Sequence, residues 1–427
     1  MKAISISSPR PFHHPTPGSP LSCGKVSLEA LAKRYGTPLY VYSGDAIRER
    51  VEMLQTAFAS VPNTLCYAVK ANSSLAILKL LSEQGCGFDI VSGGELERIR
   101  RAAPAALGRV VFSGVGKQVW EIDAALSADI LLFNVESEAE LEILSQRATT
   151  AGKTAKVALR VNPDVFAETH PYISTGLREH KFGIAIETAR DVYRRAAELP
   201  NLEPAGVSVH IGSQIRAVEP FHQSLLRVRG LVDELRADGL DIRYVDGGGG
   251  FGIEYGNEAF DPAASVAAYA AAIRSALDGL DAALLLEPGR FLVAQAGALL
   301  TRVLYTKQNG TKHFVITDAA MNDLIRPALY QAHHEILPVL SDDRPTQTAD
   351  IVGPVCETGD FFARDRTLPE LRAGDLAVLL DAGAYGMSLA SHYNTRVHPA
   401  EVLITRGQPR LIRKRETLDS ILAPELL

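Results

Sequence analysis

Residues 64–72, TLCYAVKAN, form a short apolar run that ends beside a lysine, Lys70. Further runs of this kind follow along the chain, each rich in Val, Ile and Leu and each ended by polar or glycine residues. Near-continuous apolar runs are typical of parallel strands that are covered on both faces. The eight predicted strands are TLCYAVKAN (64–72), GFDIVS (87–92), RVVFSGV (109–115), ADILLFNV (128–135), AKVALRVNP (155–163), AGVSVHIGS (205–213), DIRYVDGGGG (241–250) and ALLLEPG (283–289).

Helical patterns separate the predicted strands. DAIRERVEMLQTAFAS (45–60) precedes the first strand, and similar stretches follow later ones. Asp45 and Ser137 are predicted N-caps of two of these helices. Strands that alternate with helices over about 250 residues match the size of a (β/α)8 TIM barrel. A doubly wound open sheet is the alternative fold.

The pattern changes after about residue 295. Asn309-Gly310 separates two strand-like runs and predicts a hairpin. Short strands continue from there, which predicts a mostly β second domain. The expected organisation is a flexible leader (1–26), a segment that joins the β domain (27–44), an α/β barrel (45–293) and a mostly β C-terminal domain (294–427).

Composition narrows the class of protein. The chain of 427 residues carries a net charge of -6, which argues against a nucleic-acid partner. No apolar run has the length of a membrane span, and the N-terminus lacks a signal-peptide pattern. Four cysteines without CxxC spacing indicate reduced thiols, so a cytoplasmic location is expected. His13 and His14 are interpreted as solvated residues, and no metal site is expected.

Polar side chains gather where the predicted strands end. Active-site residues of a barrel come from the C-terminal ends of its strands. Here these ends carry Lys70, Asp89, His210, Ser213, the glycine-rich run GGGGFG (247–252) and the run EPGR (287–290). Each feature alone could be structural, but together they predict one pocket.

The glycine run at 247–252 satisfies GxGxxG, yet it does not predict a dinucleotide site. The stretch after it, IEYGNEAFDP, is not an amphipathic helix, and no lysine with Ser or Thr follows to make a P-loop. Consecutive glycines still allow backbone N–H groups to close on a phosphate, and phosphate sites recur near the last two strands of barrels. A flexible turn is the alternative interpretation.

A lysine, a phosphate cradle and an acid are the groups that pyridoxal phosphate needs. Lys70 can form a Schiff base, and Glu287 can pair with the pyridinium nitrogen. Arg290 can bind the phosphate, although Glu287 and Arg290 could also be a structural ion pair. His210 can lie against the ring or be an ordinary core histidine.

Four motifs, YAVKAN, HIGSQ, GGGFG and EPGR, resemble the barrel-type (fold type III) pyridoxal-phosphate-dependent decarboxylases, whose barrel is of the alanine-racemase type. The resemblance covers roughly residues 27 to 420. Two positions depart from the pattern, since Thr358 and His392 stand where serine and asparagine are commoner. Three stretches are similar to the diaminopimelate decarboxylase branch: MNDLIRPALYQAHHEI (321–336), GPVCETGDFFARDR (353–366) and DAGAYGMSLASHYNTR (381–396).

The resemblance implies a set of site residues. Lys70 would carry the Schiff base and Cys356 would be the proton donor. The residues that bind the cofactor would be Lys70, Asp89, His210, Ser213, Gly249, Gly250, Glu287, Pro288, Gly289, Arg290 and Tyr385. The residues that bind the substrate would be Arg290, Arg326, Tyr330, Glu357 and Tyr385.

The resemblance also implies an activity. The chain would decarboxylate meso-2,6-diaminopimelate to L-lysine and CO2, the last step of lysine biosynthesis, at a site shared across a homodimer. Arg326 supports a substrate with a distal carboxylate, which an arginine can bind bidentately. The alternatives are a decarboxylase of arginine, ornithine or carboxynorspermidine, an amino-acid racemase on the same barrel, which Glu287 disfavours, and a non-catalytic cofactor carrier.

Overall fold

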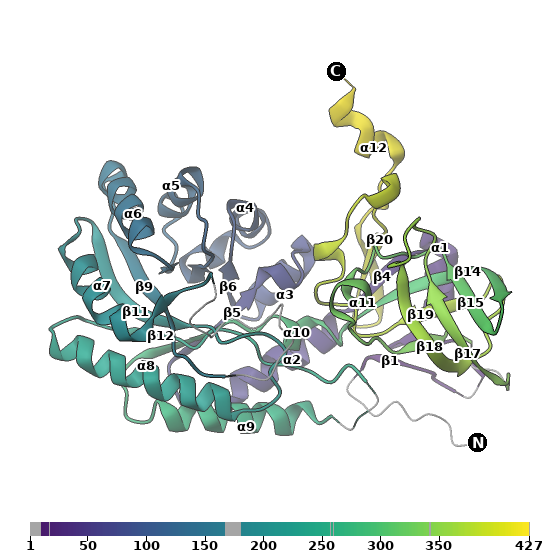
Figure 1. Cartoon of the computed structure of the whole chain (residues 1–427), viewed down its shortest axis with the longest axis horizontal. Coiled ribbons are helices and arrows are strands. Elements are labelled where there is room, and N and C mark those ends of the chain that lie inside the picture. Colours follow the sequence, from purple (N-terminus) through teal and green to yellow (C-terminus); the bar gives the residue numbers. More distant parts are fainter. Residues whose placement is uncertain are drawn as a thin grey trace. The chain divides into compact units, whose positions relative to one another are not determined.

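A computed structural model describes residues 10–16, 18–166, 181–256, 258, 260–340 and 343–426 of the chain (Figure 1). The chain divides into two compact units. The barrel unit comprises Arg50–Ile253 and Pro262–Phe291, and the β unit comprises Met1–Glu49, Glu254–Asp261 and Leu292–Leu427. The expected barrel range, 45–293, included residues 45–49, 254–261 and 292–293, which group instead with the β unit.

Parallel strands close into a ring in the barrel unit, and they follow one another in chain order. The last strand pairs with the first through Leu285 and Thr64, which completes the ring. The predicted (β/α)8 barrel is therefore confirmed, and the open sheet is wrong. The ring consists of β5 (Asn63–Ala68), β6 (Gly87–Ile90), β7 (Val110–Phe112), β8 (Leu132–Val135), β9 (Ala155–Asn162), β11 (Leu202–Val209), β12 (Tyr244–Asp246) and β13 (Ala283–Leu286), and β10 (Ile184–Ala185) pairs with β9.

Helices follow the strands and cover the outside of the ring, as the blue, teal and green ribbons of α4 to α9 in Figure 1 show. They bury apolar faces against the strands, and the interior of the ring is filled by Cys66, Val111, Leu132 and their neighbours. The helices of this unit are α3 (Leu75–Glu83), α4 (Gly93–Ala102), α5 (Val119–Ser127), α6 (Glu138–Ala151), α7 (Ile186–Glu198), α8 (Glu219–Ala237) and α9 (Pro262–Ala276), with the 3-10 helices η1 (Val69–Ala71) and η2 (Pro104–Arg109).

One of the two predicted N-caps is correct. Ser137 caps α6, because its side chain accepts the N–H of Glu140 at 3.2 Å. Asp45 is not a cap but lies inside α2 (Gly44–Ala57), and Ser43 accepts the N–H of Ala46 in its place. The side chain of Asp45 accepts the N–H of Arg406 instead, a contact distant in sequence.

The β unit is built on a mostly antiparallel sheet, as predicted for the second domain. Within it, β4 pairs with both β14 and β20, and the predicted turn at Asn309-Gly310 joins β14 to β15. Its strands are β4 (Leu39–Ser43), β14 (Gly297–Asn309), β15 (Lys312–Thr317), β16 (Ile336–Pro338), β17 (Thr346–Val352), β18 (Phe361–Pro369), β19 (Leu376–Leu379), β20 (Ala400–Thr405) and β21 (Gln408–Arg413). Short helices complete the chain: α1 (Leu28–Tyr35), α10 (Arg290–Val293), α11 (Arg326–Tyr330), α12 (Leu418–Leu422), η4 (Met387–Leu389), η5 (Tyr393–Thr395) and η6 (Ala423–Glu425).

Residues 10–16 and 18–26 differ from the flexible leader expected over 1–26. The short strands β1 (Phe12–His13), β2 (Ser22–Cys23) and β3 (Val26–Ser27) form a small antiparallel sheet. Phe12 and Leu21 are buried in the core of the β unit, and Arg10 forms an ion pair with buried Asp381 at 2.6 Å. A few apolar side chains thus anchor a stretch whose prolines and polar residues favoured a loose chain, while residues 1–9 and 17 lie outside the described range.

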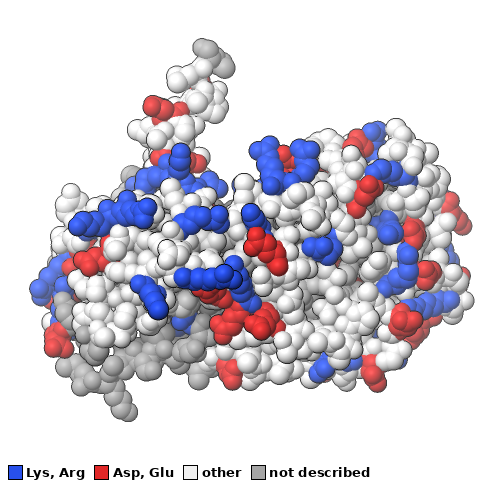
Figure 2. All heavy atoms as spheres, turned by 180° about the vertical axis from the view of Figure 1, so that it is seen from behind, with Lys and Arg blue, Asp and Glu red and all other residues white. Residues whose placement is uncertain are grey.

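Charged side chains of both signs occur across the face shown in Figure 2, interspersed with uncharged residues. Among the helices that the structure describes, none is both long enough and apolar enough to cross a membrane.

Candidate active site

Lys70 lies in η1, two residues beyond the end of β5, at the carboxyl end of the barrel. Its Nζ forms an ion pair with Oδ2 of Asp89, which is fully buried in β6. The other oxygen of Asp89, Oδ1, has no hydrogen-bond partner among the described residues. The Lys70 side chain keeps 35% of its surface exposed, so the amine is held by a buried anion while remaining accessible to a ligand.

The glycine loop that follows β12 is closely packed and is not a flexible turn. A Cβ at Gly249 would lie 2.3 Å from the carbonyl oxygen of Glu287, and one at Gly250 would lie 2.3 Å from that of Gly212. Gly250 also has a φ of 103°, in the region that favours glycine. The loop therefore packs against the backbone that follows β11 and β13, so closely that there is no space for a side chain at Gly249 or Gly250.

His210, just beyond β11, is bonded to this loop. Its Nδ1 accepts the backbone N–H of Gly249 at 3.1 Å, so that nitrogen carries a lone pair rather than a proton. Burial, together with the positive charges of Arg160 and Lys70, lowers the pKa of His210 well below its usual value. The ring is thus neutral, and its 3.9 Å approach to Glu287 is not an ion pair.

Glu287 and Asp246 form a buried pair of carboxyl groups at the ends of β13 and β12. Ser113 donates to Oε1 of Glu287 at 3.3 Å, and Asn134 donates to Oδ2 of Asp246 at 2.7 Å. Burial and the neighbouring carboxylates raise the pKa of Glu287 well above its usual value, and burial also raises the pKa of Asp246. A cation placed against Glu287 would reverse this effect, so the pair is suited to a positively charged ligand.

The EPGR run turns directly after β13 and is held against η1. The carbonyl of Pro288 accepts the N–H of Ala68 at 3.2 Å, and a Cβ at Gly289 would lie 3.1 Å from Cβ of Ala68. Arg290, at the start of α10, is buried, and its Nη2 donates to Oγ of Ser213 at 3.1 Å. Together, Arg290 and Ser213 offer an anion a guanidinium and a hydroxyl beside the glycine loop.

Sequence reasoning missed Ser113, Asn134, Arg160 and Asp246, all of which lie at this end of the barrel. Arg160 in β9 is buried and forms an ion pair with Glu136 at 3.2 Å. Each of the four is a polar residue in or directly after an apolar run. The charges of Arg160 and Asp246 are a signal of the kind that marks Lys70, whereas Ser113 and Asn134 carry no such signal.

The remaining predicted residues lie in the β unit, and two of them begin and end α11. Arg326 is buried, its guanidinium lies 4.4 Å from the ring centroid of Tyr255, and its Nη1 donates to Nε2 of His334 at 2.9 Å. Tyr330 is half-buried at the end of α11. Tyr385, in the segment after β19, has a left-handed φ of 56°.

Cys356 and Glu357 lie on the turn after β17. The Cys356 side chain is exposed, and its backbone N–H donates to Oδ1 of Asn394 at 2.9 Å. Glu357 accepts a hydrogen bond from Tyr393 and thereby raises the pKa of that phenol. The turn itself is fixed by Asp360, which accepts the N–H of Val355 at 2.7 Å. The thiol is thus presented to solvent from a backbone that is held in place.

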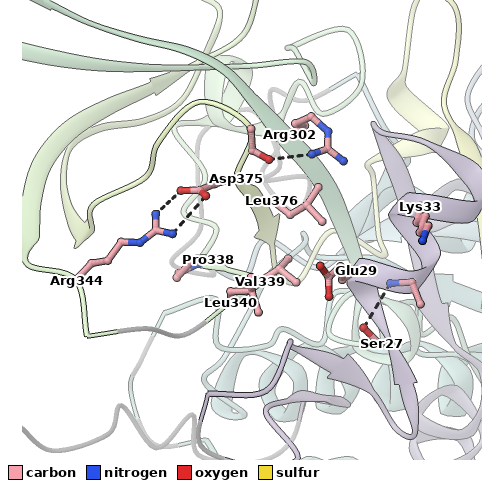
Figure 3. Close-up of a pocket in the computed structure, with 12 residues that line it drawn as sticks. Ser27, Glu29, Lys33, Arg302, Pro338, Val339, Leu340, Arg344, Asp375 and Leu376 are labelled. Atoms are coloured by element: carbon pink, nitrogen blue, oxygen red, sulfur yellow. Dashed lines mark hydrogen bonds and ion pairs between the residues drawn. The ribbon is translucent and has the colours of Figure 1, made fainter.

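A cavity of about 530 Å³ in the β unit contains none of these residues (Figure 3). It lies beside α1, and the ion pair between Arg344 and Asp375 forms part of its lining. The candidate cofactor site is therefore not this cavity but the polar carboxyl end of the barrel, where Lys70, Asp89, His210 and Glu287 lie.

Comparison with known proteins identifies the family. The family model "Pyridoxal-dependent decarboxylase, pyridoxal binding domain" matches residues 44–294. A diaminopimelate decarboxylase of Pseudomonas aeruginosa is 52% identical over 402 residues, which cover 94% of this chain and 96% of that protein. The chain belongs to the diaminopimelate decarboxylase family. Its cofactor is accordingly pyridoxal phosphate.

Solved structures of the diaminopimelate decarboxylase family share the fold. The enzyme of Helicobacter pylori, complexed with L-lysine, gives a TM-score of 0.89 at 43% identity and covers 93% of this chain and 98% of that chain. The enzyme of M. jannaschii, also in complex with L-lysine, gives a TM-score of 0.91 at 37% identity over 97% of this chain and 98% of that one.

Proposed function

We propose that this chain decarboxylates meso-2,6-diaminopimelate to L-lysine and CO2 with pyridoxal phosphate, as the last step of lysine biosynthesis. The observation that carries the proposal is the buried acid Glu287 beside a lysine and a glycine loop at one end of the barrel. The L-lysine bound to two related enzymes, which is the expected product, supports the same substrate.

The residues fit the cofactor. Three buried carboxyl groups, those of Asp89, Asp246 and Glu287, gather near one lysine, and the charges of the first two help to raise the pKa of Glu287. A protonated pyridine nitrogen would supply the missing positive charge. Gly249 and Gly250 leave no room for a side chain, so the loop presents backbone to a phosphate.

Each side chain of the barrel then has a defined task. When bound, pyridoxal phosphate withdraws electrons from the bond that breaks. Lys70 would hold the cofactor covalently, and Glu287 would keep its ring nitrogen protonated. Neutral His210 would pack on the ring without adding charge. Arg290 and Ser213 would bind the phosphate with the glycine loop, against which Pro288 and Gly289 fix the turn.

The β unit would supply the substrate contacts and the proton. Cys356, whose backbone is fixed by Asn394, would donate the proton that replaces CO2. Glu357 would bind the distal ammonium of the substrate, and Arg326, oriented by His334, would bind its distal carboxylate. Tyr330, Tyr385 and Arg290 would complete this pocket.

We further propose a homodimer in which the Cys356 segment of one subunit completes the site of the other. Large apolar side chains are exposed on the loops and helix starts at the carboxyl end of the barrel, as a protein interface requires: Leu75, Val91, Val115, Val119 and Trp120.

A cytoplasmic location is proposed as well, since the four cysteines are free thiols. We assign cofactor binding to residues 45–293 and completion of the substrate pocket to 294–427.

One experiment tests the function. Purified protein with meso-diaminopimelate should release CO2 and L-lysine, and its cofactor absorbance should disappear in Lys70→Ala but persist in Lys79→Ala, an exposed lysine of α3. Turnover of ornithine or arginine in place of diaminopimelate would contradict the substrate. Cofactor absorbance retained in Lys70→Ala would contradict the site.

A further inference from the structure

We propose that His392, His398 and Glu416 form a binding site for a divalent transition metal of the zinc class. One nitrogen of each imidazole and one carboxylate oxygen all lie within 4.8 Å of one another. Imidazole nitrogen and carboxylate oxygen are common zinc ligands. No step of the proposed decarboxylation uses these three side chains.

The Glu416 carboxylate contacts both imidazoles, one through each of its oxygens. Its Oε2 is 2.7 Å from Nε2 of His392, and its Oε1 is 3.0 Å from Nδ1 of His398. The two rings stack, with centroids 4.1 Å apart. Ligands of a tetrahedral zinc ion at bond lengths of about 2.1 Å are about 3.4 Å apart. The two distances between the Glu416 oxygens and the imidazole nitrogens would therefore need to lengthen by less than about 1 Å to admit a metal.

The backbone holds two of the three ligands in place. His398 precedes β20 and Glu416 follows β21, so they face each other beyond the end of this hairpin. The N–H of Glu416 donates to the carbonyl of His398 at 3.2 Å, and the N–H of His398 donates to Oε2 of Glu416 at 3.0 Å. The third ligand, His392, lies outside this pairing, at the N-cap of η5.

Hydrogen bonds connect the three proposed ligands. Both imidazoles are bonded to the Glu416 carboxylate, His392 through Nε2 at 2.7 Å and His398 through Nδ1 at 3.0 Å. The other ring nitrogen of His398, Nε2, is buried without a hydrogen-bond partner among the described residues.

The neighbouring charges and the exposure of His392 also favour metal binding. Arg413, whose charge acts on His398, is paired with Glu401 at 2.7 Å. The His392 side chain is 44% exposed, so an ion can enter from solvent and keep a water as its fourth ligand. Magnesium and calcium prefer six or more oxygen ligands, so they should not compete for this donor set.

A bound metal would fix the segment that faces Cys356. Tyr393 and Asn394 directly follow His392, and they contact Glu357 and the N–H of Cys356. A metal on His392 would tie this segment to the β20–β21 hairpin. This consequence for catalysis rests on the proposed function, whereas metal binding itself does not.

Calorimetric titration of zinc into the metal-free holoenzyme tests the site. The protein carries Cys356→Ser and no histidine tag, because an exposed thiol or a tag would also bind zinc. We expect one equivalent to bind, with magnesium unable to displace it. Loss of an outer-sphere partner of a metal ligand costs about 10- to 100-fold in affinity, so His398→Gln and Glu416→Gln should each weaken binding by at least about 100-fold.

Two further variants keep the test decisive. His392→Asn changes only an exposed loop residue, so this variant should fold and should bind zinc more weakly. It therefore serves as the test if His398→Gln does not fold. His313→Gln, at an exposed histidine of β15, should bind zinc as the parent does. Absence of zinc binding, or equal affinity in His392→Asn and His313→Gln, would overturn the site. Decarboxylase activity plays no part in this readout, so the two proposals can fail separately.

Discussion

The backbone N–H of Gly249 donates to Nδ1 of His210 over 3.1 Å. This bond joins the loop proposed to hold the phosphate to the ring proposed to pack on the cofactor. It also sets the tautomer of His210, since Nδ1 accepts and the proton of the neutral ring must lie on Nε2. Loop and imidazole therefore form one unit at the carboxyl end of the barrel.

His210→Phe should test that unit, because it keeps a flat ring but leaves the N–H of Gly249 without an acceptor. An unsatisfied buried donor costs about 1–3 kcal/mol, so we expect cofactor affinity to fall by roughly 10- to 100-fold. Titration of the apoprotein with pyridoxal phosphate measures this, with His313→Phe as an exposed control. Unchanged affinity in His210→Phe would show that the bond does not support the cofactor.

Glu287→Gln should separate catalysis from stability. The change removes the charge proposed to support the protonated ring, so kcat should fall by about 10²–10³-fold. Folding stability at pH 8 should not fall, because a carboxyl with a raised pKa is costly to ionise. Steady-state kinetics and urea unfolding measure the two effects. Asp246→Asn is the control and should reduce kcat less than Glu287→Gln does. A fully active Glu287→Gln would refute the proposal that Glu287 pairs with the pyridinium nitrogen.

Gly250→Ala and Gly239→Ala form a matched pair. Both glycines have a positive φ, but a Cβ at Gly250 would meet the carbonyl of Gly212 at 2.3 Å, whereas one at Gly239 would meet nothing within 4 Å. Gly239→Ala should cost about 1–2 kcal/mol from backbone strain alone. Gly250→Ala should cost about 1–3 kcal/mol more and should weaken cofactor binding. Equal unfolding midpoints in urea for the two variants would contradict a closely packed loop.

Cys356→Ala should lower decarboxylation by about 10²–10⁴-fold, the range expected when a proton donor is lost. The cofactor should still bind, because the backbone N–H that bonds Asn394 remains. Lysine formation and the cofactor absorbance measure these outcomes together. Turnover at the parent rate would remove Cys356 from the proposed mechanism.

Glu95 should make stability depend on pH. Burial raises its pKa from 4.5 to about 7, although its Oε2 accepts the N–H of Val91 at 2.7 Å. A raised pKa means that the folded state binds more protons, so this contribution is present below pH 4.5 and is lost as pH rises through about 7. In Glu95→Gln, the free energy of unfolding should fall by roughly 2 kcal/mol less than in the parent as pH rises through this range.

Urea unfolding of Glu95→Gln and the parent at pH 5 and pH 8 measures the difference. Glu97→Gln is the control, since hydrogen bonds from Arg100 and Arg101 lower the pKa of Glu97 to about 2, outside this window. Parallel pH profiles for the parent and Glu95→Gln would contradict the assignment.

The barrel could be predicted because its strands are continuous apolar runs, and a charged residue at the end of such a run stands out. Lys70 and Glu287 were found in this way. Ser113, directly after β7, and Asn134, inside β8, could not be singled out because they are uncharged, and serine after a strand is an ordinary turn residue. Their role depends on hydrogen bonds to Glu287 and Asp246, partners more than a hundred positions away in the chain.

The amino-terminal segment shows a second limit of sequence patterns. Phe12 and Leu21 stand apart among prolines and polar residues, so no periodicity marks them as core residues. Their burial depends on strands such as β4 and β14, which the chain brings to them from far away. The misplaced cap at Asp45 has a similar cause, because its side chain is engaged by Arg406.

The ion pair between Arg10 and Asp381 has a practical meaning for anyone who edits the gene. A shortened form that starts after residue 26 would appear harmless, since the deleted residues contribute nothing to the proposed chemistry. It would nevertheless leave a fully buried carboxylate without its guanidinium and would strip Phe12 and Leu21 from the core. Purification tags and fusion partners therefore belong ahead of Arg10, and the residues between it and Ser27 should be kept as part of the folding unit.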